Sequence, residues 1–291
     1  MKMEAISLLE WQNRFGTEES CAEALKKVRW PDGFICPECA GKEFSYITTR
    51  QAYQCRHCHH QTSVTSATIF HSTNLPLVKW FWAIYLCASD KGGISALRLS
   101  KHIEVTWRTA HRLLHKIRAV MAHRDSMYRL SGLIESDDAY VGGKKPGKRG
   151  RGAAGKQPLL VAVENREDHA GFMAAAVVET ISKDSVREFC CRHLQPGQEV
   201  RTDALAALNA VAEDHMHEKK ITPPEEASRW LPLVHIVIGN LKQFLNGTFH
   251  GVSHTYLHEY ISEFCYRFNR RFWERELPMR LLNACLAHAP I

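Results

Sequence analysis

The sequence lacks an apolar run long enough to cross a membrane, which takes about 18–20 consecutive residues. The longest candidate, Leu75 to Ser89, is too short and is interrupted by Lys79. The first residues also lack the charged-then-apolar pattern of a secretory leader, because Glu4, Glu10 and Arg14 interrupt it. We therefore expect an intracellular, cytoplasmic protein with no membrane partner.

In a reducing compartment, ten cysteines indicate a metal site and buried thiols rather than disulfide bonds. Two C-x2-C pairs stand fifteen residues apart, and each pair fits a tight turn that directs two thiolates at one point. We expect a structural, non-catalytic Zn²⁺ bound by Cys36, Cys39, Cys55 and Cys58. The alternative ligands nearby are His57, His59 and His60, which otherwise form a polar surface. The other cysteines lack such spacing and are expected to be small apolar fillers.

The charge balance shows a modest excess of basic residues, unevenly placed. The net charge is +7 in 291 residues, and basic residues cluster at 98–124, 142–156 and 267–280. Such clusters favour an anionic partner such as nucleic acid over a merely soluble basic surface. An apolar content of 45% and a charged content of 24% are ordinary for a folded chain of two or three domains.

The segment from Leu133 to Gly152 combines acidic and basic residues in an informative order. It begins as a strand that carries Glu135, Asp137 and Asp138. A loop without acidic residues follows, and its basic residues are Lys144, Lys145, Lys148, Arg149 and Arg151. Carboxylates on a strand suit a divalent cation, and a cationic loop suits a phosphate backbone. The segment therefore predicts metal-dependent chemistry on nucleic acid.

The middle of the chain predicts three helices. Pro76 can begin the first, Ser95 can cap a short helix over 96–102, and Thr106 can cap a longer one over 107–121. A short helix, a tight turn and a longer helix outline a helix-turn-helix. Its outward face would present Arg108, Arg112 and Lys116 to a DNA groove. The alternative is an ordinary three-helix bundle with a solvated basic face.

From residue 129 onward the pattern changes to alternating strands and helices. The order is three strands, a helix, a strand and a helix, over 133–141, 158–165, 171–179, 182–194, 198–202 and 205–213. This order predicts a ribonuclease-H-like α/β domain. In that layout the first and fourth strands are neighbours, so that Asp137 and Asp203 can share a cation. Taken alone, either aspartate could instead be a turn residue, and Asp203 could be a helix cap.

Phosphodiester cleavage by two metal ions requires carboxylates that hold both cations, and Mg²⁺ suits such oxygen ligands. A third ligand is expected near a later helix, where His235, Asn240 and Lys242 stand. The Asn240 amide oxygen can bind Mg²⁺ and Lys242 can contact phosphate, although Asn240 could simply be a helix cap. The runner-up ligands Glu259 and Glu263 are better explained as a solvated helix face with Arg267.

Several strings spread over nearly the whole chain carry a family resemblance. They are RWPDGFICPEC, CRHC, IESDDAYVGGKK, GRGAAGK, VRTD and LPLVHIVIGNLKQFLNGTFHGVS, continued by YLHEYISEFCYRFNRRFW. Together they resemble the bacterial insertion-sequence transposases of the DDE superfamily, in the subgroup with an N-terminal zinc ribbon. One departure is Asp138-Ala139, where the family pattern predicts Glu-Thr and which would change the hydrogen bonding around the metals.

The resemblance implies a DNA transposase that cleaves at inverted terminal repeats and joins the 3′ ends to target DNA. It places Asp137, Asp203 and Asn240 at the three metal-binding positions, a D-D-N set, with Lys242 as a fourth catalytic member. It implies catalytic Mg²⁺ with Mn²⁺ as a substitute, double-stranded DNA as partner, a homodimer or higher oligomer on that DNA, and a place at the bacterial nucleoid.

The last helical segment agrees with this interpretation. Apolar residues recur at intervals of three to four from Leu257 to Phe272, so this helix should dock on the sheet. Beside them, Arg270 and Arg271 are expected to contact the DNA backbone, the alternative being ordinary surface charge.

We therefore expect a zinc ribbon with its preceding helix over 1–72, a helix-turn-helix-like domain over 73–128 and a catalytic domain over 129–291. A competing function is a non-enzymatic DNA-binding regulator whose nuclease-like domain is inert. Another is a structure-specific nuclease or junction resolvase, which the N-terminal DNA-reading modules disfavour.

Overall fold

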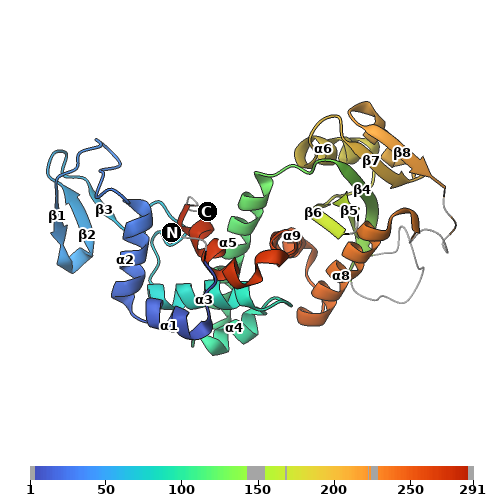
Figure 1. Cartoon of the computed structure of the whole chain (residues 1–291). Coiled ribbons are helices and arrows are strands. Elements are labelled where there is room, and N and C mark those ends of the chain that lie inside the picture. Colours follow the sequence, from blue (N-terminus) through green and yellow to red (C-terminus); the bar gives the residue numbers. More distant parts are fainter. Residues whose placement is uncertain (1–3, 143–154, 168, 222, 224–228, 288–291) are drawn as a thin grey trace. The chain divides into compact units, whose positions relative to one another are not determined.

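The computed structural model describes residues 4–142, 155–167, 169–221, 223 and 229–287. It contains two compact units, Met1–Val120 with Phe272–Ile291, and Met121–Arg271 (Figure 1). Over the described ranges, no helix combines the length and the apolar character that crossing a membrane requires.

Helices dominate the first unit. They are α1 (Leu8–Phe15), α2 (Glu18–Arg29), α3 (Leu77–Ser89), α4 (Ala96–His102), α5 (Trp107–Ser126, which continues into the second unit) and α10 (Leu277–Ala287). The Ser95 and Thr106 side chains accept the N–H groups of Arg98 and Thr109, so both expected caps are present. The short helix α4, a tight turn and the long helix α5 give the helix-turn-helix outline that the sequence predicts.

Aromatic side chains form the centre of this helical unit. Trp11 and Phe15 of α1 contact Phe81 and Tyr85 of α3, with ring centroids 5.0 to 6.3 Å apart. The C-terminal helix α10 packs on α2 and α3. The described residues 272–287 thus belong to the helical unit, whereas the sequence predicts them within a domain over 129–291.

A small three-stranded sheet in the same unit forms the ribbon. Its strands β1 (Phe44–Ile47), β2 (Ala52–Cys55) and β3 (Gln61–Ser63) are antiparallel and lie in this order. A short 3-10 turn, η1 (Thr48–Arg50), joins the first two strands. Trp30, Phe34 and Tyr53 pack against Cys36 and Cys55, so the ribbon core is built directly on the cysteines.

The second unit contains a mixed five-stranded sheet. Its strands are β4 (Leu133–Val141), β5 (Gln157–Arg166), β6 (His169–Val177), β7 (Glu199–Asp203) and β8 (Met216–Lys220). The spatial order is β6-β5-β4-β7-β8; the first three strands are antiparallel, whereas β7 is parallel to both β4 and β8. This order and these directions confirm the predicted ribonuclease-H-like fold.

Helices cover both faces of this sheet (Figure 1). On one face lie α8 (Pro232–Thr248) and α9 (Leu257–Phe268), packed on Leu159, Val161 and Val163 of β5. On the other face lie α6 (Lys183–His193) and the 3-10 segment η2 (Ala206–Glu213), packed on Leu160 and Ala162. Because successive residues of a strand point to opposite faces, the continuous apolar run of β5 fits a strand buried on both sides. Two further 3-10 segments are η3 (His254–Tyr256) and η4 (Arg271–Glu276).

Candidate active site and metal centre

The parallel pairing of β4 with β7 brings distant aspartates together. Ser136 is the register partner of Thr202, so Asp137 and Asp203 follow side by side. Asp137, Asp138 and Asp203 each offer a carboxylate oxygen, and these oxygens lie within 4.8 Å of one another. All three residues are half-buried. Of the acidic residues singled out from the sequence, this cluster contains both aspartates of the expected pair.

Each of the paired aspartates also accepts a local backbone hydrogen bond. Asp137 Oδ1 accepts the N–H of Asp138 at 2.8 Å, and Asp203 Oδ1 accepts the N–H of Leu205 at 3.0 Å. Asp203 does not cap the helical segment that follows, because the N-cap of η2 is Leu205, which forms no side-chain cap hydrogen bond. These bonds restrict the carboxylate orientation before any ligand binds.

His235, in the first turn of α8, lies next to the acidic cluster. Its Nε2 lies 3.1 Å from Asp137 Oδ2. The hydrogen bond with Asp137 raises the pKa of His235, and the nearby charges of Glu135 and Asp203 act in the same direction, while burial opposes them. The arrangement therefore favours a protonated imidazole that holds Asp137 in a fixed orientation.

The acidic cluster opens into a cavity of about 630 Å³. Three lysines from different elements line it: Lys156 just before β5, Lys220 at the end of β8 and Lys242 of α8. Trp230 also lines it, and its indole N–H donates to the Thr202 carbonyl at 2.9 Å, next to Asp203. Carboxylates beside ammonium groups suit a cation together with a phosphate group.

The sequence pattern did not single out Lys156, Lys220 or Trp230. Lys156 ends a segment whose earlier basic residues carry the stronger charge signal. Lys220 belongs to β8, a strand of sequence MHEKK that is mostly exposed and has no apolar alternation. Trp230 stands directly before the LPLVHIVIGN string, which forms the helix that carries His235, and this position was the available signal for it.

Asn240 is exposed, and the described residues that line the cavity do not include it. Helix geometry explains this placement. Asn240 follows His235 by five residues, so it lies about 140° around the helix from His235. Lys242 follows His235 by seven residues, so it lies within about 20° of the same side. Lys242 therefore shares the cavity-facing side of α8 with His235, and Asn240 points elsewhere. As an internal residue of α8, Asn240 is not that helix's cap either.

The chemistry of the cluster fits a hard divalent cation. Such cations take oxygen ligands, and Mg²⁺ in particular is bound through one or two carboxylates together with water and substrate phosphate. Asp137, Asp138 and Asp203 supply carboxylate oxygens close enough to share an ion. Three carboxylates at this separation repel one another, so a bound cation would relieve that repulsion.

The runner-up ligands do not belong to this cluster. Glu259 and Glu263 lie on α9 and are 5% and 0% exposed. Glu263 forms an ion pair with Arg267 at 2.9 Å, as the four-residue spacing predicts. The expectation of a solvated helix face was wrong, because this face of α9 is buried.

The two arginines expected to contact DNA have partners inside the second unit. Arg270 is 8% exposed, pairs with Asp125 at 2.6 Å and stacks over Tyr266 with its guanidinium carbon 3.8 Å from the ring centroid. Arg271 donates to the carbonyls of Phe268, Gly171 and Ala170. Arg270 thus joins the end of α9 to α5, and Arg271 joins it to β6 of the sheet.

The outward face of the helix-turn-helix is partly as expected. Arg108 and Arg112 of α5 are exposed. Lys116 instead donates to the Ile69 carbonyl at 3.0 Å, so it belongs to the interior of the first unit. The loop residues Lys144, Lys145, Lys148, Arg149 and Arg151 lie outside the described residues.

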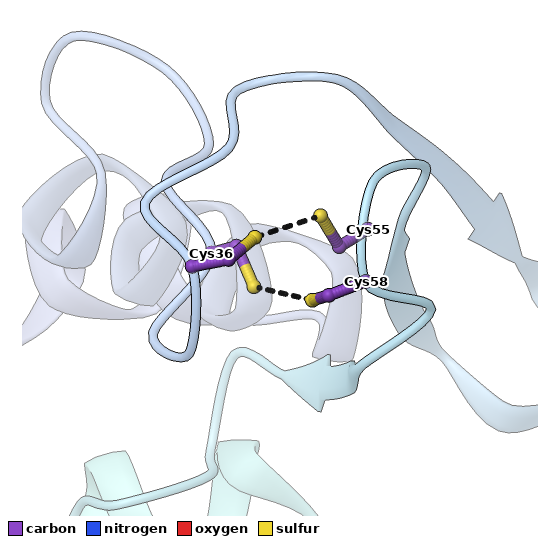
Figure 2. A group of neighbouring side chains, drawn as sticks. Cys36, Cys55 and Cys58 are labelled. Carbon is purple, nitrogen blue, oxygen red and sulfur yellow. Dashed lines mark hydrogen bonds between the residues drawn. The ribbon is translucent and has the colours of Figure 1, made fainter.

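The four cysteines of the ribbon converge as their spacing predicts. Cys36 from one loop and Cys55 and Cys58 from the other point toward one another (Figure 2). The Sγ atoms of Cys36 and Cys58 are 3.5 Å apart, and those of Cys39 and Cys55 are 3.6 Å apart. A tetrahedral zinc site with Zn–S bonds of about 2.3 Å separates its sulfurs by about 3.8 Å. The donor set fits structural Zn²⁺, and within the described chain the group contains no histidine.

The backbone prepares this site for thiolates. Backbone N–H groups of Cys58 and His57 lower the pKa of the Cys55 thiol to about 6. Backbone N–H groups also favour the thiolates of Cys39 and Cys58, but hydrogen bonds with the neighbouring thiols and burial outweigh them and raise the pKa of both. Gly41 approaches the sulfurs closely, since a Cβ there would lie 3.2 Å from Cys55 Sγ and 3.3 Å from Cys39 Sγ. A glycine at this position leaves room for the sulfurs.

The fold and the paired carboxylates are those of the ribonuclease-H-like proteins with acidic centres, here combined with a four-cysteine ribbon. Residues 129–269 match the ISXO2-like transposase domain, and residues 16–61 match the transposase zinc-ribbon domain. The chain belongs to the insertion-sequence transposases defined by these two domains.

Proteins similar to this chain include one relative in sequence and two solved structures. An uncharacterized protein in the transposable element ISH50 of Halobacterium salinarum is 26% identical over 219 residues, and the match covers 69% of this chain and 72% of that protein. Among solved structures, the Mos1 strand transfer complex is similar with 13% identity and a TM-score of 0.29, covering 71% of this chain and 77% of that chain. A pre-cleavage Mos1 transpososome is similar with 11% identity and a TM-score of 0.26, covering 68% and 75%.

Proposed function

We propose that this transposase cleaves DNA at the inverted terminal repeats of its insertion sequence and transfers the 3′ ends to target DNA with two Mg²⁺ ions, for which Mn²⁺ can substitute. One observation carries the proposal: Asp137, Asp138 and Asp203 converge in a cavity that three lysines also line. A metal-binding cluster beside phosphate-binding charge is what phosphodiester chemistry requires.

Some residues of the site would bind the cations, and others would bind the DNA substrate. Asp137 and Asp203 would hold the cations, which when bound activate the attacking oxygen and stabilise the leaving one. Asp138 supplies a further carboxylate oxygen in the same cluster. His235 holds Asp137 through the bond of 3.1 Å. Lys156, Lys220 and Lys242 face the same cavity and would hold phosphates of the strand being cut.

DNA recognition belongs to other parts of the chain. The exposed Arg108 and Arg112 of the helix-turn-helix would contact the terminal repeat, and the basic loop with Lys144, Lys145, Lys148, Arg149 and Arg151 would contact backbone near the cut. Transposition joins two ends, so we expect a homodimer or higher oligomer on double-stranded DNA.

The test is a nicking assay on DNA that carries the repeats flanking the gene, in Mg²⁺. Asp203→Asn should abolish cleavage and retain end binding, because it removes a cation ligand and leaves the surface intact. The matched control is Asp184→Asn, whose side chain on α6 is 90% exposed and lies in an ion pair with Arg187, and it should cut normally. Cleavage by Asp203→Asn at the wild-type rate would refute the site. Tight end binding by a wild-type protein that never cuts would favour the inert regulator.

A further inference from the structure

We propose that Glu135 is a positioning residue of the active site: it anchors the first turn of α8 and so sets His235 and Lys242 against the acidic cluster. The inference rests on the proposed function for its effect on cleavage, whereas its effect on His235 can be measured without DNA.

Glu135 is a buried carboxylate with three hydrogen bonds. It is 1% exposed and lies on β4, two residues before Asp137. Its Oε2 accepts the N–H groups of Leu233 and Val234 at 2.8 and 2.9 Å. Its Oε1 accepts the side-chain amide of Asn165 at 2.8 Å. A buried charge with this set of donors is satisfied, and each donor belongs to another element of the second unit.

The start of α8 needs such an acceptor. Its N-cap, Leu231, has no side chain that can accept a hydrogen bond, and Pro232 at the first position has no N–H. The next two N–H groups, of Leu233 and Val234, are those that a Ser, Thr or Asp cap would satisfy. Glu135 takes that role from the sheet, and its negative charge is favourable at the positive end of the helix dipole.

A further hydrogen bond joins β4 to α8 at the active site. One residue after Val234, His235 Nε2 meets Asp137 Oδ2 at 3.1 Å. Glu135 and Asp137 are two residues apart on β4 and therefore share one face of the strand. The hydrogen bonds of Glu135 and Asp137 together fix the position of α8 along its axis and its rotation about that axis relative to β4. Lys242, two helical turns further on, faces the cavity only while that rotation is kept.

Glu164 provides a matched control on the neighbouring strand. It is equally buried, at 3%, and it also accepts backbone N–H groups, from Ser131 and Phe172, both at 3.1 Å. Its remaining partner is Arg166. Loss of the Glu164 charge should lower stability by a similar mechanism, but Glu164 forms no hydrogen bond with the described first turn of α8.

The experiment compares Glu135→Gln and Glu164→Gln in the full-length protein. Hydrogen exchange of the Leu233 and Val234 amides and the ¹⁵N shifts of the His235 imidazole report on the anchor in the absence of DNA and Mg²⁺. Glu135→Gln should speed both exchange rates and move the His235 shifts toward those of Asp137→Asn. Cleavage should fall by roughly 10- to 100-fold, because small displacements of catalytic groups cost that much. Glu164→Gln should change neither the His235 shifts nor the cleavage rate of the folded protein.

The double variant Glu135→Gln with Asn165→Asp keeps the proposal testable if the single variant folds poorly. It keeps a donor-acceptor pair between these two side chains and returns a negative charge beside the first turn of α8, so it should recover part of the exchange protection and the His235 shifts. Unchanged His235 shifts in folded Glu135→Gln, or equal losses in both glutamate variants, would overturn the proposal. A wild-type protein that never cuts DNA, but whose His235 shifts still respond to Glu135→Gln, would refute the proposed function and leave the positioning role in place.

Discussion

A carboxylate oxygen of Asp137 lies within 4.8 Å of one of Asp203, although two strands and a helix separate these residues along the chain. Both project from adjacent parallel strands, so the sheet register, and not a loop, determines their separation. A site built on strands is held more rigidly than one built on loops. The pair is therefore ready to receive a cation without a large rearrangement of the backbone.

The first prediction concerns the third oxygen ligand. Asp138 belongs to the acidic cluster, whereas Asn240 is exposed and points away from the cavity lining. We expect Asp138→Asn to raise the Mg²⁺ concentration for half-maximal cleavage by about 10- to 100-fold, since losing a metal-site group typically costs that much. Asn240→Ala should change it little. Titration of Mg²⁺ in the nicking assay measures both values.

The opposite ranking, with Asn240→Ala the more damaging variant, would show that α8 turns when substrate binds and would restore the D-D-N assignment. Wild-type end binding by both variants is the control, because it separates loss of metal from loss of fold.

Sequence patterns predict most of the second unit, because β5 is a continuous apolar run and turn or loop residues separate the strand candidates. β4 stands out by its acidic residues, and parallel pairing of the first and fourth strands follows from the element order. In the first unit, the cysteine pairs stand out by their spacing. β8 could not be found in this way, because MHEKK pairs through its backbone and buries almost no side chain.

The side-chain environment was harder to predict than the fold. The rotation of α8, which turns Lys242 and not Asn240 to the cavity, depends on the anchor at Glu135, a contact between residues far apart in the chain. The burial of Arg270 depends in the same way on Asp125. A single sequence shows the charge of these residues but not their partners.

The second prediction concerns the ribbon. Cys36→Ser should release zinc and unfold the ribbon, because structural metal binding is coupled to folding and Trp30, Phe34 and Tyr53 pack on the cysteines. The helices α1 and α2 should stay folded, since α2 packs on α3. Elemental analysis and Trp fluorescence measure the two effects. Cys191→Ser, at an exposed cysteine outside the ribbon, is the control and should keep its zinc. Wild-type protein that contains no zinc would contradict the structural zinc site.

The third prediction concerns the basic loop. Replacing Lys144, Lys145, Lys148 and Arg149 with alanine should weaken DNA binding and flatten its salt dependence, by about 0.9 in slope for each phosphate that the loop no longer neutralises. The affinity is measured between low and moderate salt. A control that removes the same number of positive charges replaces Lys26, Lys27, Lys183 and Arg192, which lie on α2 and α6. An equal slope in the loop variant and the wild type would mean that the loop does not touch the backbone.

The fourth prediction separates two groups of arginines that look alike in the sequence. Arg270→Ala should destabilise the second unit by about 3–5 kcal/mol, because it leaves Asp125 as a buried carboxylate without its partner. Burial already raises the pKa of Asp125 despite the attraction of Arg270, so loss of the arginine should raise it further. Denaturant unfolding measures the decrease in stability.

Arg108→Ala and Arg112→Ala should affect DNA binding and not stability. Both side chains are exposed, so their removal should leave the free energy of unfolding nearly unchanged and weaken binding to the terminal repeat. A stable Arg270→Ala variant with weakened DNA binding would instead place Arg270 on the DNA, which requires the ion pair with Asp125 to open when DNA binds. The two outcomes differ in which assay responds, and one purified preparation of each variant is enough to tell them apart.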